Sequence, residues 1–321
     1  MDLRSLEFRI SQLQMSKFGL LIKVISDFVY LNFNIVPNWK IRHLVSIILD
    51  SNPLGQVTPS YFPKIDVIIP LSKKDLETIE LTLFSLRLNL VNKIEKITVV
   101  YADDINIEKI SHLDCETINE RDFLDKRLTR ELSCINFNSN RGWVMQQVIK
   151  LYGAMISKNL GTFVIDGDTL LTKSRLPLIV HGGNRTMQEL NVTHGYYEPY
   201  SNFCKEMFEF EVNSPFQFVA HFQMMQSSVV RQMFPNGVES LIEMLRKLKN
   251  KPEKFALSEF QMYGSFLENF DPYSYKLGKW HNLACDMIPN FRSKKIEDRF
   301  AEVKAQFKYY DSVSFHAYLR N

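Results

Sequence analysis

The chain has 321 residues, of which 45% are hydrophobic, 23% charged and 12% aromatic. This globular composition excludes a mainly disordered chain, and Gly and Pro, at 12 residues each, are too few for a collagen or a linker protein. A formal net charge of +3 is too small to indicate a nucleic-acid partner, and the basic excess lies in residues 1–60 and 291–321.

Four cysteines are spread along the chain, and none forms a C-x-x-C pair. This usage predicts free thiols in a reducing, cytoplasmic compartment rather than a disulfide framework. The first ten residues mix acidic and basic side chains, and no clean apolar segment follows them, so we expect no secretory signal.

Residues 1–50 have helical patterns, and residues 51–64 are rich in Pro, Ser and Gly, which is typical of a linker. We therefore expect residues 1–60 to form an N-terminal helical extension. Within it, charged and amide side chains interrupt the apolar segment Phe18–Val36 too often for a membrane span. Two interpretations stay open: a helix packed on the protein's core or in a homodimer contact, and a helix lying peripherally on the inner face of the cell membrane.

Strand and helix patterns alternate after the linker. Short, almost wholly apolar runs are typical of strands buried on both faces, as in a parallel sheet. An α/β fold with a mostly parallel sheet flanked by helices is therefore predicted for residues 65–175. The predicted elements are the strand Ile65–Pro70, the helix Leu76–Leu90, the strand Ile97–Tyr101, the strand Leu132–Phe137, the helix Arg141–Lys158 and the strand Thr162–Ile165.

The second half of the chain is less regular. Its predicted elements are the strand Phe216–Gln223, the helix Ser258–Glu268, the helix Lys294–Phe307 and the strand Ser312–Tyr318.

The strongest motif is Asp166-Gly167-Asp168, directly after the strand Thr162–Ile165. In parallel sheets, ligands bind beyond the carboxyl ends of the strands. Two carboxylates one residue apart can reach one hard cation, Mn²⁺ or Mg²⁺, which would in turn bind a diphosphate. Gly167 permits a tight turn or a close approach of a ligand. The alternative is a solvated turn capped by an Asp side chain.

A second motif begins the helix just upstream, at Asn140, Arg141 and Gly142. A helix N-terminus binds anions, and the Arg141 guanidinium adds a charge suited to phosphate. Gln146 and Gln147, one turn later, could form hydrogen bonds with sugar hydroxyls. The alternative is an ordinary Asn cap before a core helix.

These motifs together resemble the donor half of GT-A fold glycosyltransferases, in which an Asn-Gly helix precedes the D-x-D strand. More closely, four motifs in the same order are similar to an uncharacterised bacterial family assigned as glycosyltransferases. They are G-W-x-x-Q-Q at 142–147, D-x-D-T at 166–169, S-E-F at 258–260 and S-F-H at 314–316. The usual D-A-D of that family is D-G-D here. The resemblance covers roughly residues 65–320.

The resemblance implies one GT-A domain over residues 61–321, with a donor half at 65–175 and an acceptor half with the C-terminal tail at 176–321. It implies a metal-dependent transfer of a hexose from a nucleotide diphosphate sugar, with UDP favoured, to a glycan or lipid-linked acceptor. This chemistry fits bacterial surface polysaccharide synthesis, and an inverting outcome is favoured over a retaining one.

The resemblance also assigns roles to single residues. Those expected to bind the nucleotide sugar are Pro70, Leu71, Ser72, Asp103, Asn140, Arg141, Gly142, Gln146, Gln147, Asp166, Gly167 and Asp168. The metal ligands would be Asp166, Asp168 and His316, and the general base that takes the acceptor proton would be Glu259. His221, Trp280 and His281 are candidates for the acceptor pocket. Packing alone is the alternative for the histidines and Trp280, and a favourable helix-dipole contact is the alternative for Glu259.

Three other functions compete with this interpretation. A sugar-phosphate nucleotidyltransferase would share the sheet, but the loop Pro70–Lys74 lacks the glycines such an enzyme uses. An aspartyl phosphatase would need its threonine one residue later than Thr169. A non-catalytic nucleotide-sugar-binding protein of the same fold would keep the site without the reaction.

Overall fold

The structure is a computed structural model. It describes residues 62–135, 141–174, 176, 178–182, 185–192, 197–210, 212, 217–249, 251, 255–271, 274–279, 282–285, 291, 295–308 and 310–316. The predicted N-terminal extension lies outside the described residues, as do Asn140, Trp280 and His281.

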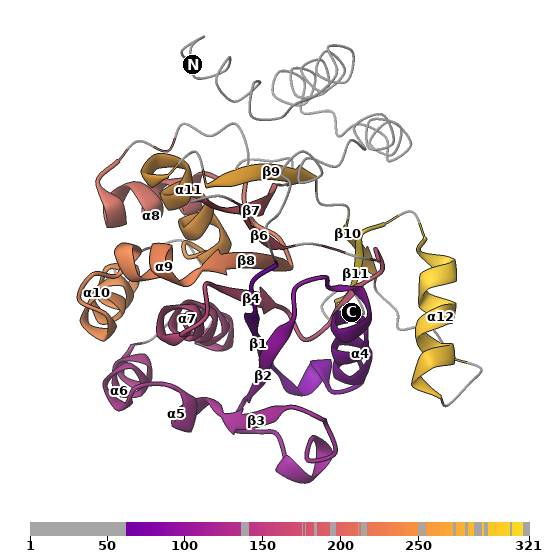
Figure 1. The fold of residues 1–321 in the computed structure, drawn as a ribbon. Coiled ribbons are helices and arrows are strands. Elements are labelled where there is room, and N and C mark those ends of the chain that lie inside the picture. The colour runs from indigo at the N-terminus through magenta and orange to yellow at the C-terminus, as the bar shows by residue number, and fades with distance from the viewer. Residues whose placement is uncertain are drawn as a thin grey trace, which may run out of the picture.

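A five-stranded sheet forms the centre of the fold (Figure 1). Its strands lie in the order β3-β2-β1-β4-β8, the first four parallel and β8 antiparallel to β4. This mostly parallel sheet confirms the predicted α/β class. The strand bounds are β1 Ile65–Leu71, β2 Ile94–Tyr101, β3 Glu116–Asn119, β4 Gly161–Ile165 and β8 Phe222–Gln226.

The apolar runs become central strands because alternate side chains pack against helices on opposite faces. Ile68 of β1 packs into a cluster with helix α7 (Arg141–Ile156), whereas Val67 and Ile69 pack with helix α4 (Ile79–Asn89). The two helices therefore lie on opposite sides of the sheet (Figure 1). Both carry apolar residues at helical spacing, as the sequence predicts.

The remaining elements are two smaller sheets and further helices. The strands are β5 Thr169–Leu171, β6 Ile179–Gly182, β7 Arg185–Val192, β9 Tyr275–Lys279, β10 Asn282–Cys285 and β11 Ser312–Phe315, and they form sheets ordered β10-β11-β5 and β6-β7-β9. The helices are α5 Glu120–Phe123, α6 Lys126–Cys134, α8 Glu198–Phe208, α9 Ser227–Met233, α10 Val238–Lys249, α11 Glu259–Phe270 and α12 Ile296–Gln306, with short 3-10 helices η2 Lys73–Asp75 and η3 Ile107–Lys109.

Strand β11 returns to the segment that follows the central strand β4. β11 pairs antiparallel with β5, which directly follows the D-G-D motif, and parallel with β10. Helix α12 packs on α4 through a third cluster that contains Leu81 and Phe300. This return places Phe315 and His316 beside the carboxyl end of β4, although they lie about half the chain length away in sequence.

Two strand predictions need correction. The predicted strand Leu132–Phe137 is wrong, since residues 126–134 form helix α6. Asp125 caps this helix by accepting the Arg127 N–H, and Leu128 and Leu132 bury one face at helical spacing. The strand expected at Phe216–Gln223 begins only at Phe222. No helix among the described residues is long and apolar enough to cross a membrane.

The two glycines of α7 test the contact of this helix with the sheet. A methyl group on Gly153 would lie 2.8 Å from a side-chain carbon of Ile68, whereas one on Gly142 would meet nothing within 4 Å. We expect Gly153→Ala to lower the free energy of unfolding by about 1–2 kcal/mol through overpacking. Gly142→Ala should leave it unchanged or raise it by up to ~1 kcal/mol. Urea unfolding of both variants measures this, and equal effects would contradict the packing described.

Candidate active site

The Asp166-Gly167-Asp168 turn lies at the carboxyl end of the central strand β4, as predicted. The Gly167 carbonyl oxygen accepts hydrogen bonds from the hydroxyls of Thr78, the residue before α4, and Thr82 within α4, at 3.1 and 3.0 Å. A Cβ atom at residue 167 would lie 3.2 Å from the Cβ of Asp75 and 3.3 Å from the backbone oxygen of Pro70. Glycine therefore allows the turn to pack closely on the end of β1.

A buried lysine joins this turn to the second half of the chain. Lys150 lies on α7, and its Nζ is 2.5 Å from Oδ1 of Asp166 and 2.7 Å from Oε1 of Glu259. The lysine and Glu259 side chains are only 2% and 1% exposed, whereas the Asp166 side chain is 27% exposed. One ammonium group thus holds a carboxylate of the D-G-D turn and the first residue of α11.

Burial and ion pairing act against each other on these groups. Burial alone would raise the pKa of Asp166, but Lys150 and His221 outweigh it, and the pKa lies below its usual range. Burial would lower the pKa of Lys150, yet the two carboxylates raise it further above its usual value. Burial raises the pKa of Glu259, and Lys150 only partly opposes this. Lys150 therefore stays charged at neutral pH.

Two histidines connect the two aspartates of the turn. Nδ1 of His316 lies 3.3 Å from Oδ2 of Asp168, and Nδ1 of His221 lies 3.1 Å from Oδ2 of Asp166. The Nε2 atoms of the two rings face one another at 3.2 Å. The structure thus brings together the three predicted metal ligands, Asp166, Asp168 and His316, and His221, which the sequence proposed for the acceptor pocket.

Asp75 adds a further buried carboxylate beside the turn. Its Oδ2 accepts hydrogen bonds from the hydroxyl and the backbone N–H of Ser72, at 2.6 and 3.2 Å. Burial and the neighbouring charge of Asp168 raise the pKa of Asp75 to about 6. Ser72, which was predicted to bind the nucleotide sugar, is therefore held beside the D-G-D turn.

The other predicted donor residues are placed as follows. Leu71 is buried in the core of the sheet, and Asp103, beyond the end of β2, forms an ion pair with Arg121. Arg141 and Gly142 are exposed at the start of α7. The side chain of Gln147 is turned inward, where its Oε1 accepts the backbone N–H of Glu259 at 3.1 Å. Pro70 is buried and Gln146 is half-buried.

Lys150 and Asp75 were not among the predicted site residues. Lys150 stands between apolar positions of α7, so the helical pattern itself marks it as inward-facing and in need of a buried partner. Asp75 follows β1 in a polar stretch, and its sequence position carries no sign of the neighbouring Asp168.

The predicted metal ligands bear oxygen and nitrogen donors that suit a divalent cation. Within the described part of the chain, no group of three or more His, Cys, Asp or Glu side chains has the arrangement of a metal site. The set Asp166, Asp168 and His316 stays a prediction, as does the role of Glu259 as a base.

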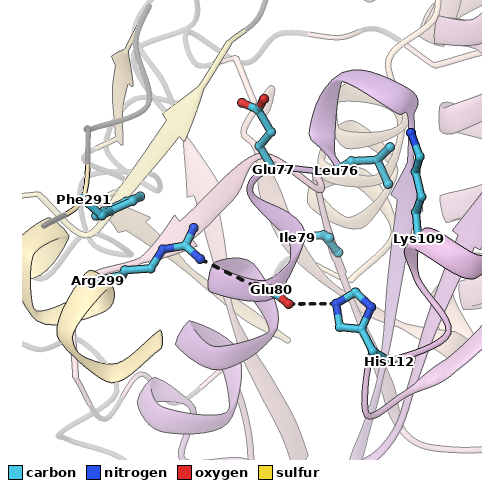
Figure 2. A pocket seen from close by; sticks show the side chains of 8 residues that line it. All are labelled: Leu76, Glu77, Ile79, Glu80, Lys109, His112, Phe291 and Arg299. Carbon is cyan, nitrogen blue, oxygen red and sulfur yellow. Dashed lines mark hydrogen bonds and ion pairs between the residues drawn. The ribbon is translucent and has the colours of Figure 1, made fainter. Parts of the chain in front are cut away.

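A separate pocket of about 450 Å³ lies beside the start of α4 (Figure 2). Figure 2 shows Glu80 between His112, at 2.8 Å, and Arg299, at 3.7 Å. The pocket shares no residue with the group formed by Asp166, Asp168, His221 and His316. Three basic residues line it, and Glu80 already pairs with two of them, His112 and Arg299. We therefore place the candidate active site at the D-G-D turn.

Neither the family models nor the curated proteins include a match to this chain. Among solved structures it is similar to mouse xyloside xylosyltransferase 1 in its apo form (11% identity, 80% of this chain and 99% of that chain, TM-score 0.41). It is also similar to an active-site mutant of LgtC (10% identity, 78% and 87%, TM-score 0.44) and to the bifunctional glycosyltransferase WbbM (14% identity, 88% and 54%, TM-score 0.39). These values are too low to transfer a substrate or a site residue to this chain.

Replacing Lys150 by methionine tests the ion-pair network. The change leaves the buried Glu259 carboxylate and Asp166 without their shared cation, and we expect it to lower the free energy of unfolding by about 3–5 kcal/mol. Adding Glu259→Gln to Lys150→Met should recover part of this loss, because it neutralises the uncompensated carboxylate. Lys158→Met, an exposed lysine just beyond the same helix, is the control. Additive effects in urea unfolding would contradict the proposed coupling.

Asp75 makes stability depend on pH in a definite direction. Because its pKa in the folded chain is about 6, above that of the unfolded chain, folding favours the protonated form. Its contribution is present below about pH 4 and is lost as the pH rises to about 6, a change of about 3 kcal/mol. Asp75→Asn should abolish this fall in chelator-treated protein, whereas Asp114→Asn, at a 98% exposed side chain, should retain it. An unchanged slope in Asp75→Asn would contradict the assignment.

Proposed function

We propose that this chain is a glycosyltransferase that moves a sugar from a nucleotide diphosphate sugar to a hydroxyl of a glycan or lipid-linked acceptor. The observation that carries the proposal is the placement of the D-G-D turn. Asp166 and Asp168 stand at the carboxyl end of the central parallel strand, with His316 of the C-terminal tail against Asp168. This is where ligands bind in open α/β sheets, and the four sequence motifs point to the same chemistry.

The charges of the cluster favour a divalent cation at this place. Four carboxylates, those of Asp75, Asp166, Asp168 and Glu259, lie at the D-G-D turn or next to it, and Lys150 pairs with two of them, Asp166 and Glu259. We expect Mn²⁺ or Mg²⁺ beside Asp166, Asp168 and His316, where carboxylate oxygens and imidazole nitrogens are the available donors. When bound, such an ion supplies positive charge to the departing diphosphate.

The chain's own residues would bind and orient the donor. Arg141 at the exposed N-terminus of α7 offers a charge for phosphate, and Ser72 and Asp103 follow neighbouring parallel strands on the side expected for the nucleoside. In the reaction, the bond from the anomeric carbon to the diphosphate oxygen breaks. The acceptor oxygen forms a new bond to that carbon and loses its proton to a base.

Glu259 is the predicted base, and its surroundings define what that role requires. Its carboxylate is 1% exposed and accepts a hydrogen bond from Lys150. A base must come within about 2.6–3.2 Å of the proton it removes, directly or through one water. Glu259 can act only if an acceptor enters and its side chain leaves Lys150.

The assay is nucleoside diphosphate release from a panel of nucleotide sugars in the presence of Mn²⁺, with UDP-sugars first. We expect wild-type protein to bind one donor in a metal-dependent way. Asp168→Ala should weaken that binding by roughly 10–100-fold or more while the circular dichroism spectrum is retained. Asp114→Ala, at an exposed site, is the control.

Two results would overturn the proposal. Wild-type donor affinity in Asp168→Ala, measured by calorimetry with Mn²⁺, would remove the turn from the donor site. Turnover of a sugar phosphate with a nucleoside triphosphate would instead establish a nucleotidyltransferase.

A further inference from the structure

Asp168, His316, His221 and Asp166 form one continuous line of contacts. We infer that His221 and His316 bind one divalent transition-metal ion through their Nε2 atoms, and that the two aspartates hold the rings from the outer side. This deepens the proposed function, on which it rests only for the use to which the ion is put. His221 then becomes a metal ligand rather than an acceptor-site residue.

The first support is the orientation of the rings. An ionised carboxylate can only accept a hydrogen bond, so each Nδ1 that faces an aspartate acts as the donor. A neutral ring that donates from Nδ1 presents a lone pair at Nε2. The two Nε2 atoms therefore direct lone pairs toward one another. A proton or a metal ion between them would relieve this repulsion.

The second support is distance. Bonds of about 2.0–2.1 Å from imidazole nitrogens to one ion, at tetrahedral to octahedral angles, place the nitrogens about 2.9–3.4 Å apart. The Nε2 atoms of His221 and His316 are 3.2 Å apart. Histidine ligands of metals almost always donate their other N–H to a carboxylate or a carbonyl group, and both rings face a carboxylate here.

The third support is that backbone contacts fix both histidines relative to the turn. The N–H of Asp166 donates to the carbonyl oxygen of His221 at 3.0 Å, and the N–H of Phe315 donates to that of Asp168 at 3.0 Å. His316 is held in addition by its own N–H, which donates to the Cys285 carbonyl oxygen at 2.9 Å. The two rings are thus positioned by strands β8 and β11, independently of a ligand.

The surroundings also explain why Asp166 would act from the outer side. Its Oδ1 is held by the Lys150 ammonium and its Oδ2 by His221, so a cation bound directly to it would have to share an oxygen with one of these positively charged or N–H groups. The His221 side chain, 25% exposed, leaves the His221 end of the pair open to solvent, whereas that of His316 is 6% exposed. Water or phosphate oxygens can complete the coordination from the open side.

The test is made on the full chain, stripped of metal and without nucleotide. Mn²⁺ is bound to protein carrying ¹⁵N-labelled histidine, and electron-nuclear double resonance counts the histidine nitrogens at the ion. We expect two nitrogens in the wild type and one in each of His221→Gln and His316→Gln, with Mn²⁺ affinity at least 10-fold lower in each. Mg²⁺, which prefers oxygen ligands, should bind at least 10-fold more weakly than Mn²⁺.

Matched variants separate ligand loss from general damage. His112→Gln removes an exposed histidine that pairs with Glu80, and it should keep both nitrogens and full affinity. Asp166→Asn should lower the affinity about 10–100-fold and still show two nitrogens, because it removes only the outer partner of His221. The wild-type spectrum needs no variant and so holds even if one of them fails to fold.

Four results would overturn the inference: no histidine nitrogen at the ion, one nitrogen that persists in His221→Gln, equal affinity for Mg²⁺ and Mn²⁺, or no metal binding by the full chain. The last of these, together with sugar transfer by metal-free protein, would indicate that the rings share a proton instead. Two nitrogens in a protein that transfers no sugar would leave the metal site standing while the proposed function fails.

Discussion

The buried ammonium group of Lys150, held between Asp166 and Glu259, is the contact on which the candidate site depends. It joins two consecutive elements, helix α7 and the end of strand β4, to the start of helix α11, which follows 109 residues after Lys150. Removing a lysine from water is costly, and a single carboxylate would repay that cost only partly. Two carboxylates, with the Phe260 ring 4.5 Å from the ammonium, give the buried charge a full set of partners. The cost of burial is therefore offset only when all three elements are in place, which makes the arrangement specific.

The same contact leaves a surplus of negative charge. Lys150 brings one positive charge to the four carboxylates of Asp75, Asp166, Asp168 and Glu259, and it contacts only Asp166 and Glu259. Asp75 responds by holding its proton up to about pH 6, and the two histidines lie against Asp166 and Asp168. Because the side chains of Asp166 and His221 are 27% and 25% exposed, a cation can reach them from solvent. A metal-bound diphosphate brings both the cation and the anion that Arg141 can bind.

Much of the fold could be predicted from local sequence. β1, β2 and β4 are apolar runs, and α4, α7, α11 and α12 have helical periodicity or a capping residue such as Ser258, whose side chain accepts the Gln261 N–H. β3 was missed because its four residues, Glu116–Asn119, are half-exposed and mostly polar. The prediction of a strand at Leu132–Phe137 was wrong because β-propensity takes no account of Asp125, the helix cap that lies seven residues before Leu132.

The candidate site, like the fold, could be predicted only in part. The D-G-D turn could be predicted because both carboxylates and the strand that places them are contiguous. Its partners could not, because they reach it through pairing that local sequence does not encode. His221 directly precedes β8, which pairs antiparallel with β4, and His316 directly follows β11, 148 residues after Asp168 in sequence. The tail motif Ser314-Phe315-His316 was assigned to the site through resemblance, and its contacts with Thr169 and Asp168 supply a physical reason.

These contacts also constrain how Glu259 could take part in a reaction. The start of α11 is fixed from two sides, because Ser258 caps the helix and Gln147 of α7 accepts the Glu259 N–H. Movement of the whole helix end would break both bonds, so a change of side-chain rotamer is the smaller step. That change would leave Lys150 paired with Asp166 alone, one positive charge against one negative charge. Burial has raised the pKa of Glu259, which favours uptake of a proton once the carboxylate is released from the lysine. Access and basicity would therefore be coupled: a movement that brought Glu259 to an acceptor would also take it away from the positive charge of Lys150.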